Sequence, residues 1–138
     1  MYRISIIAVI AGFGTELIAD EIIRFILVIV FAQGAIEPNM SEEAATQAIK
    51  LIAEQPAFLA AVMILGTATT VGGGYLAARI ARRFPYYNGL AIGIVGLTLQ
   101  LYLWNLNPLW MNIIALLTVI PMSIWGAHLA KPHLPPPE

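Results

Sequence analysis

Long apolar runs without any Asp, Glu, Lys or Arg dominate the second half of the chain. One run covers 57–78 and another covers 84–130. The second run is too long for one crossing of a hydrocarbon core of about 30 Å, which needs about 20 residues, and it divides at the turn-forming cluster 105–108. Because lipid offers no partner to free backbone groups, we expect membrane-spanning helices over about 57–80, 88–105 and 108–129.

The N-terminal segment is less regular, because two uncharged stretches, 4–15 and 25–36, flank four charged residues. Each stretch alone is too short to span a bilayer. One helix over about 4–32 would be about 43 Å long, which matches a bilayer with its headgroups, about 40–45 Å. We therefore interpret it as one crossing with charges inside. A re-entrant pair of short helices and a cleaved signal peptide are the alternatives, although an acidic stretch stands where a small-residue cleavage site is expected.

The loop over about 33–56 contains a further helical pattern. Asn39, with Glu42 three residues on, is typical of a capping box. Apolar residues then recur at helical spacing, at Ala45, Ala48, Ile49 and Ile52. This pattern predicts a short amphipathic helix of about 14 residues that lies on the outer membrane surface or caps the bundle. Pro56 ends it and suits the first position of the next helix.

Composition supports the membrane assignment. Apolar residues make up 59% of the 138 residues and charged residues 11%, with a mean hydropathy of +0.81. In soluble domains, roughly 45–50% of the residues are apolar and about 25% are charged. The sequence therefore predicts an all-α, four-transmembrane-helix bundle as one domain over 1–130, followed by a Pro-rich tail over 131–138. A net charge of −1 argues against a nucleic-acid partner. Without Cys there is no disulfide and no thiolate nucleophile.

Basic residues are distributed unequally between the predicted loops, which sets the orientation. One set of helix ends carries Arg3, Arg79, Arg82, Arg83 and Lys131, whereas the other carries only Lys50. Four crossings then place both termini on the cytoplasmic side of a bacterial inner membrane. Arg79, Arg82 and Arg83 most simply anchor the chain at the inner interface and contact anionic lipid.

Small residues predict where the helices approach one another, because close packing replaces the hydrophobic effect as the driving force in lipid. The candidate packing positions are Gly12, Gly73, Ala77, Gly89, Gly93 and Gly96. The triplet 72–74 is not interpreted as a phosphate-binding loop, because no strand precedes it and no Lys-Ser/Thr pair follows.

Three charged residues at a spacing of four, Glu16, Asp20 and Arg24, form one stripe of the first helix, and Glu21 lies beside it. A charge at the bilayer centre costs about 2.5–3.5 kcal/mol. The stripe should therefore face protein, and we expect Asp20 to pair with Arg24.

Four polar residues from four different predicted helices fall at a similar depth, about 18–20 Å from the cytoplasmic ends at about 1.5 Å per residue. They are Glu16, Thr67, Gln100 and Thr118. We expect them to meet near the midplane, with Gln100 donating a hydrogen bond to Glu16. Such a layer either locks the helices together, forms a proton or ion site, or contacts another subunit.

No catalytic set or cofactor site is evident. His128 and His133 are the only histidines, and they fall at different depths, which argues against a bis-His haem or a metal site. No Ser-His-Asp set and no HExxH motif is present. We expect no cofactor and no enzymatic activity.

The segment Gly73-Gly74-Tyr75-Leu76-Ala77-Ala78-Arg79-Ile80-Ala81 resembles the GGYxAARIA-like end of the second helix in a loose group of small bacterial four-helix inner-membrane proteins of unknown function. The similarity covers about 57–130 and extends to Pro108-Leu109-Trp110, Pro121 and Gly126-Ala127. The resemblance implies a bacterial four-helix membrane protein without a defined reaction. The charged stripe of the first helix is not part of that pattern.

The sequence favours two functions over a third, an intramembrane enzyme or cofactor carrier. The first is a non-catalytic subunit that stabilises a larger inner-membrane complex or assembles with itself. The second is a component of a proton- or cation-conducting transporter or channel that uses Glu16, Asp20 and Glu21, and it would have to oligomerise because four helices are few for a complete transporter.

Overall fold

The computed structural model describes residues 4–37 and 39–131 and is entirely helical over these ranges. Its α-helices are α1 (Ile6–Phe31), α2 (Glu42–Ala53), α3 (Pro56–Ala81), α4 (Pro85–Tyr102) and α5 (Leu109–Ala130), with a 3-10 turn at Trp104–Leu106. Arg3, His133 and the predicted tail beyond residue 131 lie outside the described residues.

Helix α1 is continuous through its four charged residues, which corrects the alternative of two re-entrant helices. It begins after Ser5, whose hydroxyl accepts a hydrogen bond from the Ala8 N–H at 3.4 Å, as an N-cap residue does. The predicted segments 4–32, 57–80 and 108–129 agree with α1, α3 and α5 within two residues at either end. The segment 88–105 differs more, because α4 begins earlier, at Pro85.

Helix α2 is capped by Ser41 and not by Asn39, so the predicted capping box is wrong. The Ser41 hydroxyl accepts from the Ala44 N–H at 3.2 Å, and the helix is 12 residues long. Its Ile52 is buried against Leu27 of α1 and Phe58 of α3. Helix α2 therefore joins the ends of the two long helices. Pro56 occupies the first turn of α3, as predicted.

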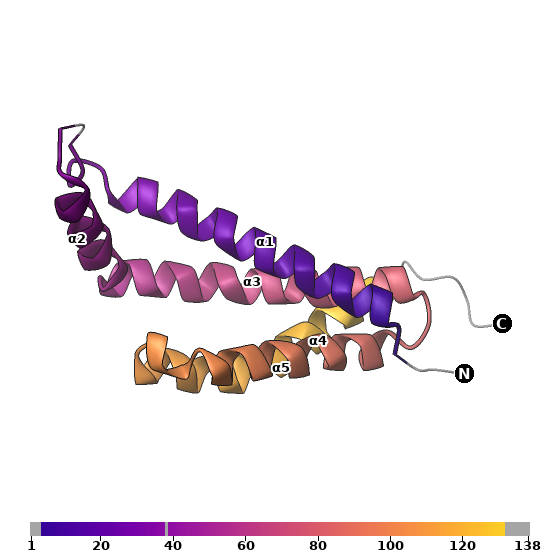
Figure 1. Ribbon diagram of the computed structural model, residues 1–138. Coiled ribbons are helices and arrows are strands. Elements are labelled where there is room, and N and C mark those ends of the chain that lie inside the picture. The colour runs from indigo at the N-terminus through magenta and orange to yellow at the C-terminus, as the bar shows by residue number, and fades with distance from the viewer. Residues whose placement is uncertain (1–3, 38, 132–138) are drawn as a thin grey trace.

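Helix α3 lies at the centre of the bundle, where it packs along α1 and α5 and also contacts α4, which forms a hairpin with α5. The start of α1, the α3–α4 turn and the end of α5 lie at one end of the bundle, and α2 and the α4–α5 turn lie at the other (Figure 1). Near the first end, α1 is close to the α4–α5 hairpin; toward α2 the two diverge (Figure 1).

Within the described residues, two helices, α3 and α5, are long and apolar enough to cross a membrane. Only 22% of the apolar window of each is buried inside the protein, so most of their apolar side chains are at least partly exposed. Helix α1 does not meet the same criterion because of its charged residues, and α4 does not because polar residues such as Asn88 and Gln100 lower its hydropathy.

Candidate functional site

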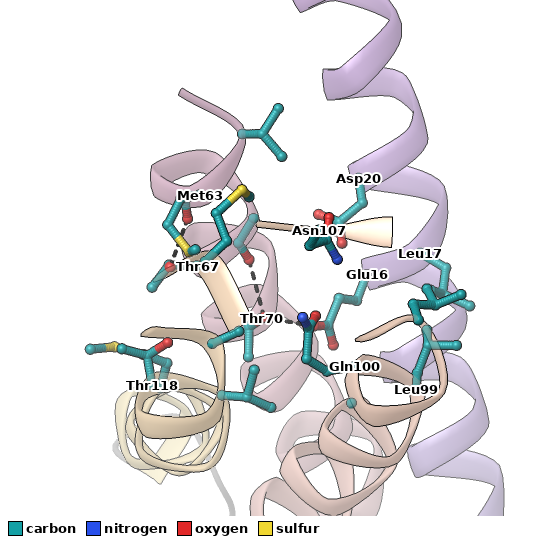
Figure 2. Close-up of a pocket in the computed structure, with 18 of the residues that line it drawn as sticks. Glu16, Leu17, Asp20, Met63, Thr67, Thr70, Leu99, Gln100, Asn107 and Thr118 are labelled. Carbon is teal, nitrogen blue, oxygen red and sulfur yellow. Dashed lines mark hydrogen bonds between the residues drawn. The ribbon is translucent and has the colours of Figure 1, made fainter. Parts of the chain in front are cut away.

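A cavity of about 290 Å³, lined by polar and apolar residues, lies between α1, α3 and the α4–α5 hairpin (Figure 2). Every member of the polar cluster expected from the sequence lines it, namely Glu16, Asp20, Glu21, Arg24, Thr67, Gln100 and Thr118. Glu16 is buried at 7% exposure, whereas Glu21 and Arg24 are exposed. The structure therefore gathers these residues around one space, with the charged groups on the α1 side.

Glu16 is held between α1 and α3. Its Oε1 accepts a hydrogen bond from the Thr70 hydroxyl at 2.7 Å, and Figure 2 shows its side chain reaching from α1 toward Thr70. Its Oε2 is buried without a hydrogen-bond partner among the described residues. A Cβ on Gly73 would stand 2.7 Å from this oxygen. An alanine at position 73 would therefore force the carboxyl group, the far end of a flexible side chain, to shift.

Thr70 has two acceptors for its single hydroxyl proton, because Gly66 O lies 3.1 Å from the same oxygen. When Glu16 is ionised, Thr70 can donate to it; when Glu16 carries a proton, Glu16 can donate to Thr70 while Thr70 donates to Gly66. This arrangement can satisfy the hydrogen bond between Glu16 and Thr70 in both protonation states.

Asp20 repeats this geometry one turn along the helix. Its Oδ1 accepts from the Thr69 hydroxyl, which also lies 2.7 Å from Gly66 O. The expected pairing of Asp20 with Arg24 is present only as a charge interaction, because Asp20 makes its hydrogen bond across to α3 while Arg24 is exposed at the cavity edge. Thr69 and Thr70 were not among the predicted site residues; their position two and three residues beyond Thr67 on an apolar helix was the available signal.

Gln100 does not donate to Glu16. Its Nε2 donates to Asn112 Oδ1 at 2.7 Å, within the α4–α5 hairpin. Asn112 is 1% exposed and donates in turn to the carbonyl oxygens of Trp104, at 2.9 Å, and Asn107, at 3.3 Å. The amide pair thus closes the α4–α5 turn, and Asn112 is a buried polar residue that the sequence reading missed.

The remaining two layer residues bond within their own helices. Thr67 donates to Met63 O and Thr118 to Ile114 O, each at 2.8 Å. Neither hydroxyl donates to a neighbouring helix, so the interhelical hydrogen bonds of this layer are those of Glu16 with Thr70, between α1 and α3, and of Gln100 with Asn112, between α4 and α5.

The small residues named from the sequence lie at helix crossings. A Cβ on Gly12 would stand 2.6 Å from Gly73 O and 2.9 Å from Ala77 Cβ. On α4, Gly89 and Gly93 approach Ser123 and its neighbours on α5, and Gly96 approaches Val119 less closely, at 3.2 Å. The closest approach of all joins α3 to α5, where Gly74 faces Ser123 O and Gly126 faces Val71 O.

At the opposite end from α2, basic residues surround the α3–α4 turn. Arg79, Arg82 and Arg83 are all exposed, and the Arg79 guanidinium lies 5.9 Å from the centre of the Tyr75 ring. Tyr86 and His128 are hydrogen-bonded at 2.8 Å. The three arginines place positive charge at the end of the bundle that also carries Lys131.

Asn88 fixes the geometry of this end. Its side chain is fully buried and donates to Arg83 O at 3.3 Å and Phe84 O at 3.0 Å. Its Oδ1 accepts from the Ser5 N–H at 2.9 Å. One side chain therefore supports a turn in which Arg82 and Phe84 adopt left-handed φ angles of 58° and 51° and ties the start of α1 to it.

Fold and site together describe an all-helical protein with two candidate membrane-spanning helices and a carboxylate-lined cavity beside them. Among the described residues, no group of three or more His, Cys, Asp or Glu is placed to hold a metal ion. No protein-family model, curated protein or solved structure matches the chain. The resemblance seen over 57–130 stays a prediction.

Proposed function

We propose that the chain crosses the membrane four times, through α1, α3, α4 and α5, with α2 at the surface. At about 1.5 Å per residue, 26 residues of α1 or α3 measure about 39 Å and 18 residues of α4 about 27 Å, against a hydrocarbon core of about 30 Å. Helix α1 supports this, because its face away from the cavity is apolar and exposed, with Ile7 at 76% and Phe25 at 68%.

The proposed orientation follows from the two ends of the bundle. The end with the α3–α4 turn carries three arginines, and the end with α2 carries Glu37, Glu42, Glu43 and Glu54. Lys and Arg are enriched in cytoplasmic loops. The termini would therefore be cytoplasmic, in a bacterial inner membrane, and the arginines would contact anionic lipid headgroups.

Within that membrane, the chain acts as a non-catalytic subunit of a larger assembly, with itself or with other membrane proteins. The observation that carries this proposal is the exposure of Glu21 and Arg24 at the edge of the cavity. Each charge facing lipid at the bilayer centre would cost about 2.5–3.5 kcal/mol. A second chain packed over this side of α1 removes that cost.

Photocrosslinking in the native membrane tests the subunit proposal. A photoreactive phenylalanine analogue at Glu21 should crosslink to protein, whereas the same analogue at Ile22, whose exposed apolar side chain belongs to the lipid-facing surface, should not. The native mass after mild extraction should exceed the 15.0 kDa of one chain. A monomeric mass together with no crosslink from position 21 contradicts the proposal.

A second candidate function is proton or cation movement, favoured by the ability of Thr70 to bond Glu16 in both protonation states. In liposomes with a pH gradient, the wild-type protein should then dissipate the gradient and Glu16→Gln should not. Glu54→Gln, which removes an exposed carboxyl group outside the cavity, is the matched control. Equal flux through wild type and Glu16→Gln excludes this function.

A further inference from the structure

The cavity has two chemically different sides. Helix α1 contributes Glu16, Asp20 and Glu21 against the single cation Arg24. The opposite side is mixed, because the apolar residues Leu99, Leu103, Met63, Met111 and Met122 lie among the polar residues Thr67, Thr70, Gln100, Asn107 and Thr118. A space with three carboxyl groups on one side and leucine and methionine side chains among neutral polar groups on the other matches a ligand with a positive charge and a hydrocarbon body.

We propose that this cavity binds a small organic cation, an ammonium group attached to an apolar body. The ammonium group would lie against Glu16 and Asp20, and the body against the methionine and leucine side chains. Glu16 is the anchor, because it is 93% buried and one carboxyl oxygen has no hydrogen-bond partner among the described residues. That oxygen has almost no accessible surface and lies beside Gly73, so a cation in the cavity would compensate the charge of the carboxyl group at short range and not through a hydrogen bond to this oxygen.

The size and lining of the cavity restrict the ligand further. A volume of about 290 Å³ is at the lower end of small-molecule pockets, roughly 300–1,000 Å³. Methionine side chains are flexible and adapt to ligands of different shape. The site therefore suits a compact cation with one ring or a short branched chain and would tolerate variation in the apolar part.

A metal cation fits the described residues less well. Ca²⁺ takes six to eight oxygen ligands and Mg²⁺ requires near-ideal octahedral geometry, whereas no group of three or more His, Cys, Asp or Glu among these residues is placed to hold a metal. Glu16 accepts a hydrogen bond from Thr70 and Asp20 accepts one from Thr69. Each carboxyl group is therefore held by its own threonine of α3, and the two are not arranged as ligands of one ion. An organic cation needs one close carboxylate and an apolar surface.

This ligand would bind in the same cavity that the second candidate function uses. Its binding requires neither transport nor assembly with another chain. It is tested by calorimetric titration of the full chain in detergent with benzyltrimethylammonium. Saturable binding at one site is expected. Phenylacetate, with a ring of the same size and the opposite charge, should not bind.

Two variants locate the site. Glu16→Gln removes the charge, and Ala115→Phe fills the cavity while keeping every carboxyl group. Each should weaken binding about tenfold or more, equivalent to about 1.4 kcal/mol. Glu54→Gln, outside the cavity, should bind as the wild type does. Circular dichroism and gel filtration establish that each variant is folded, and Asp20→Asn replaces Glu16→Gln if the latter is not.

Loss of binding in the folded cavity variants together with wild-type binding in Glu54→Gln supports the proposal. No saturable binding to the wild type at millimolar concentration overturns it, as does equal binding by the wild type and the cavity variants. Proton flux that depends on Glu16 without binding of the organic cation would leave the transport proposal standing and refute this one.

Discussion

At the residue scale, the absence of a side chain matters most where α3 crosses α5. Gly74 faces the backbone carbonyl of Ser123 so closely that an added Cβ would overlap it. Backbone atoms on packed helices cannot move aside at little cost. The two helices can therefore approach at this point only while position 74 is glycine.

Gly74→Ala should accordingly destabilise the bundle by about 1–3 kcal/mol, the usual cost of overpacking. Gly72→Ala is the matched control two residues away, because nothing lies within 4 Å of its added Cβ and alanine favours a helix. Denaturant-induced unfolding in detergent micelles measures both. Equal stability of the two variants would contradict the close approach of α3 and α5.

Sequence reasoning was correct about which polar residues share a space and wrong about which of them bond. Depth along a helix follows from residue number, so Glu16, Thr67, Gln100 and Thr118 could be placed in one layer. The direction in which each side chain points depends on how the helices are rotated, which the sequence does not state. Gln100 therefore bonds to Asn112, twelve residues away across a hairpin turn.

At the scale of elements, α2 has a structural role that its amphipathic pattern predicts only in part. The pattern located the helix and its apolar face. It did not show that Ile52 is buried between Leu27 and Phe58, because the alternative, an apolar face immersed in lipid, produces the same spacing. Its start was missed because Asn39 and Ser41 are both good N-cap residues.

Ile52→Ala should destabilise the end of α1 and the start of α3, which pack against α2. Ile52 is 2% exposed, and deleting a buried isoleucine side chain to alanine costs roughly 2–5 kcal/mol. Leu51→Ala, at an adjacent position that is 61% exposed, should change stability by less than about 0.5 kcal/mol. Hydrogen exchange of residues 25–31 and 56–62 would show faster opening in the first variant alone.

Asn88 joins three elements, and its replacement should loosen them together. Asn88→Leu keeps the volume similar and deprives the Ser5 N–H of its acceptor. An unpartnered buried backbone group costs about 1–3 kcal/mol. The first turn of α1 should then exchange its amide protons faster, whereas the exposed Asn105→Leu should leave this region unchanged. Unaltered amide exchange at residues 5–9 in Asn88→Leu would argue against the hydrogen bond between the Ser5 N–H and Asn88.

For the whole molecule, the shape of the bundle follows from α3. Because α3 packs on both α1 and α5, its two faces carry different small residues, Gly73 toward α1 and Gly74 toward α5. Helix α1 can therefore diverge from the α4–α5 hairpin without losing contact with α3, and the cavity occupies the space between them. Neighbouring glycines thus serve two interfaces, which a list of small residues in the sequence does not reveal.

The orientation of the whole bundle is open to a direct test, because the chain contains no Cys that would obscure an introduced one. Asn105 and Lys131 lie at opposite ends of α5 and are both exposed. If the basic end is cytoplasmic, a thiol reagent that cannot cross membranes should label Asn105→Cys in intact cells. It should label Lys131→Cys only after the cells are made permeable, because four crossings leave that end inside. The reverse pattern would place the arginines of the α3–α4 turn outside, against the preference of Lys and Arg for the cytoplasmic side. Labelling of both positions in intact cells would mean that α5 does not cross the membrane, and the proposed four-span topology would then be wrong.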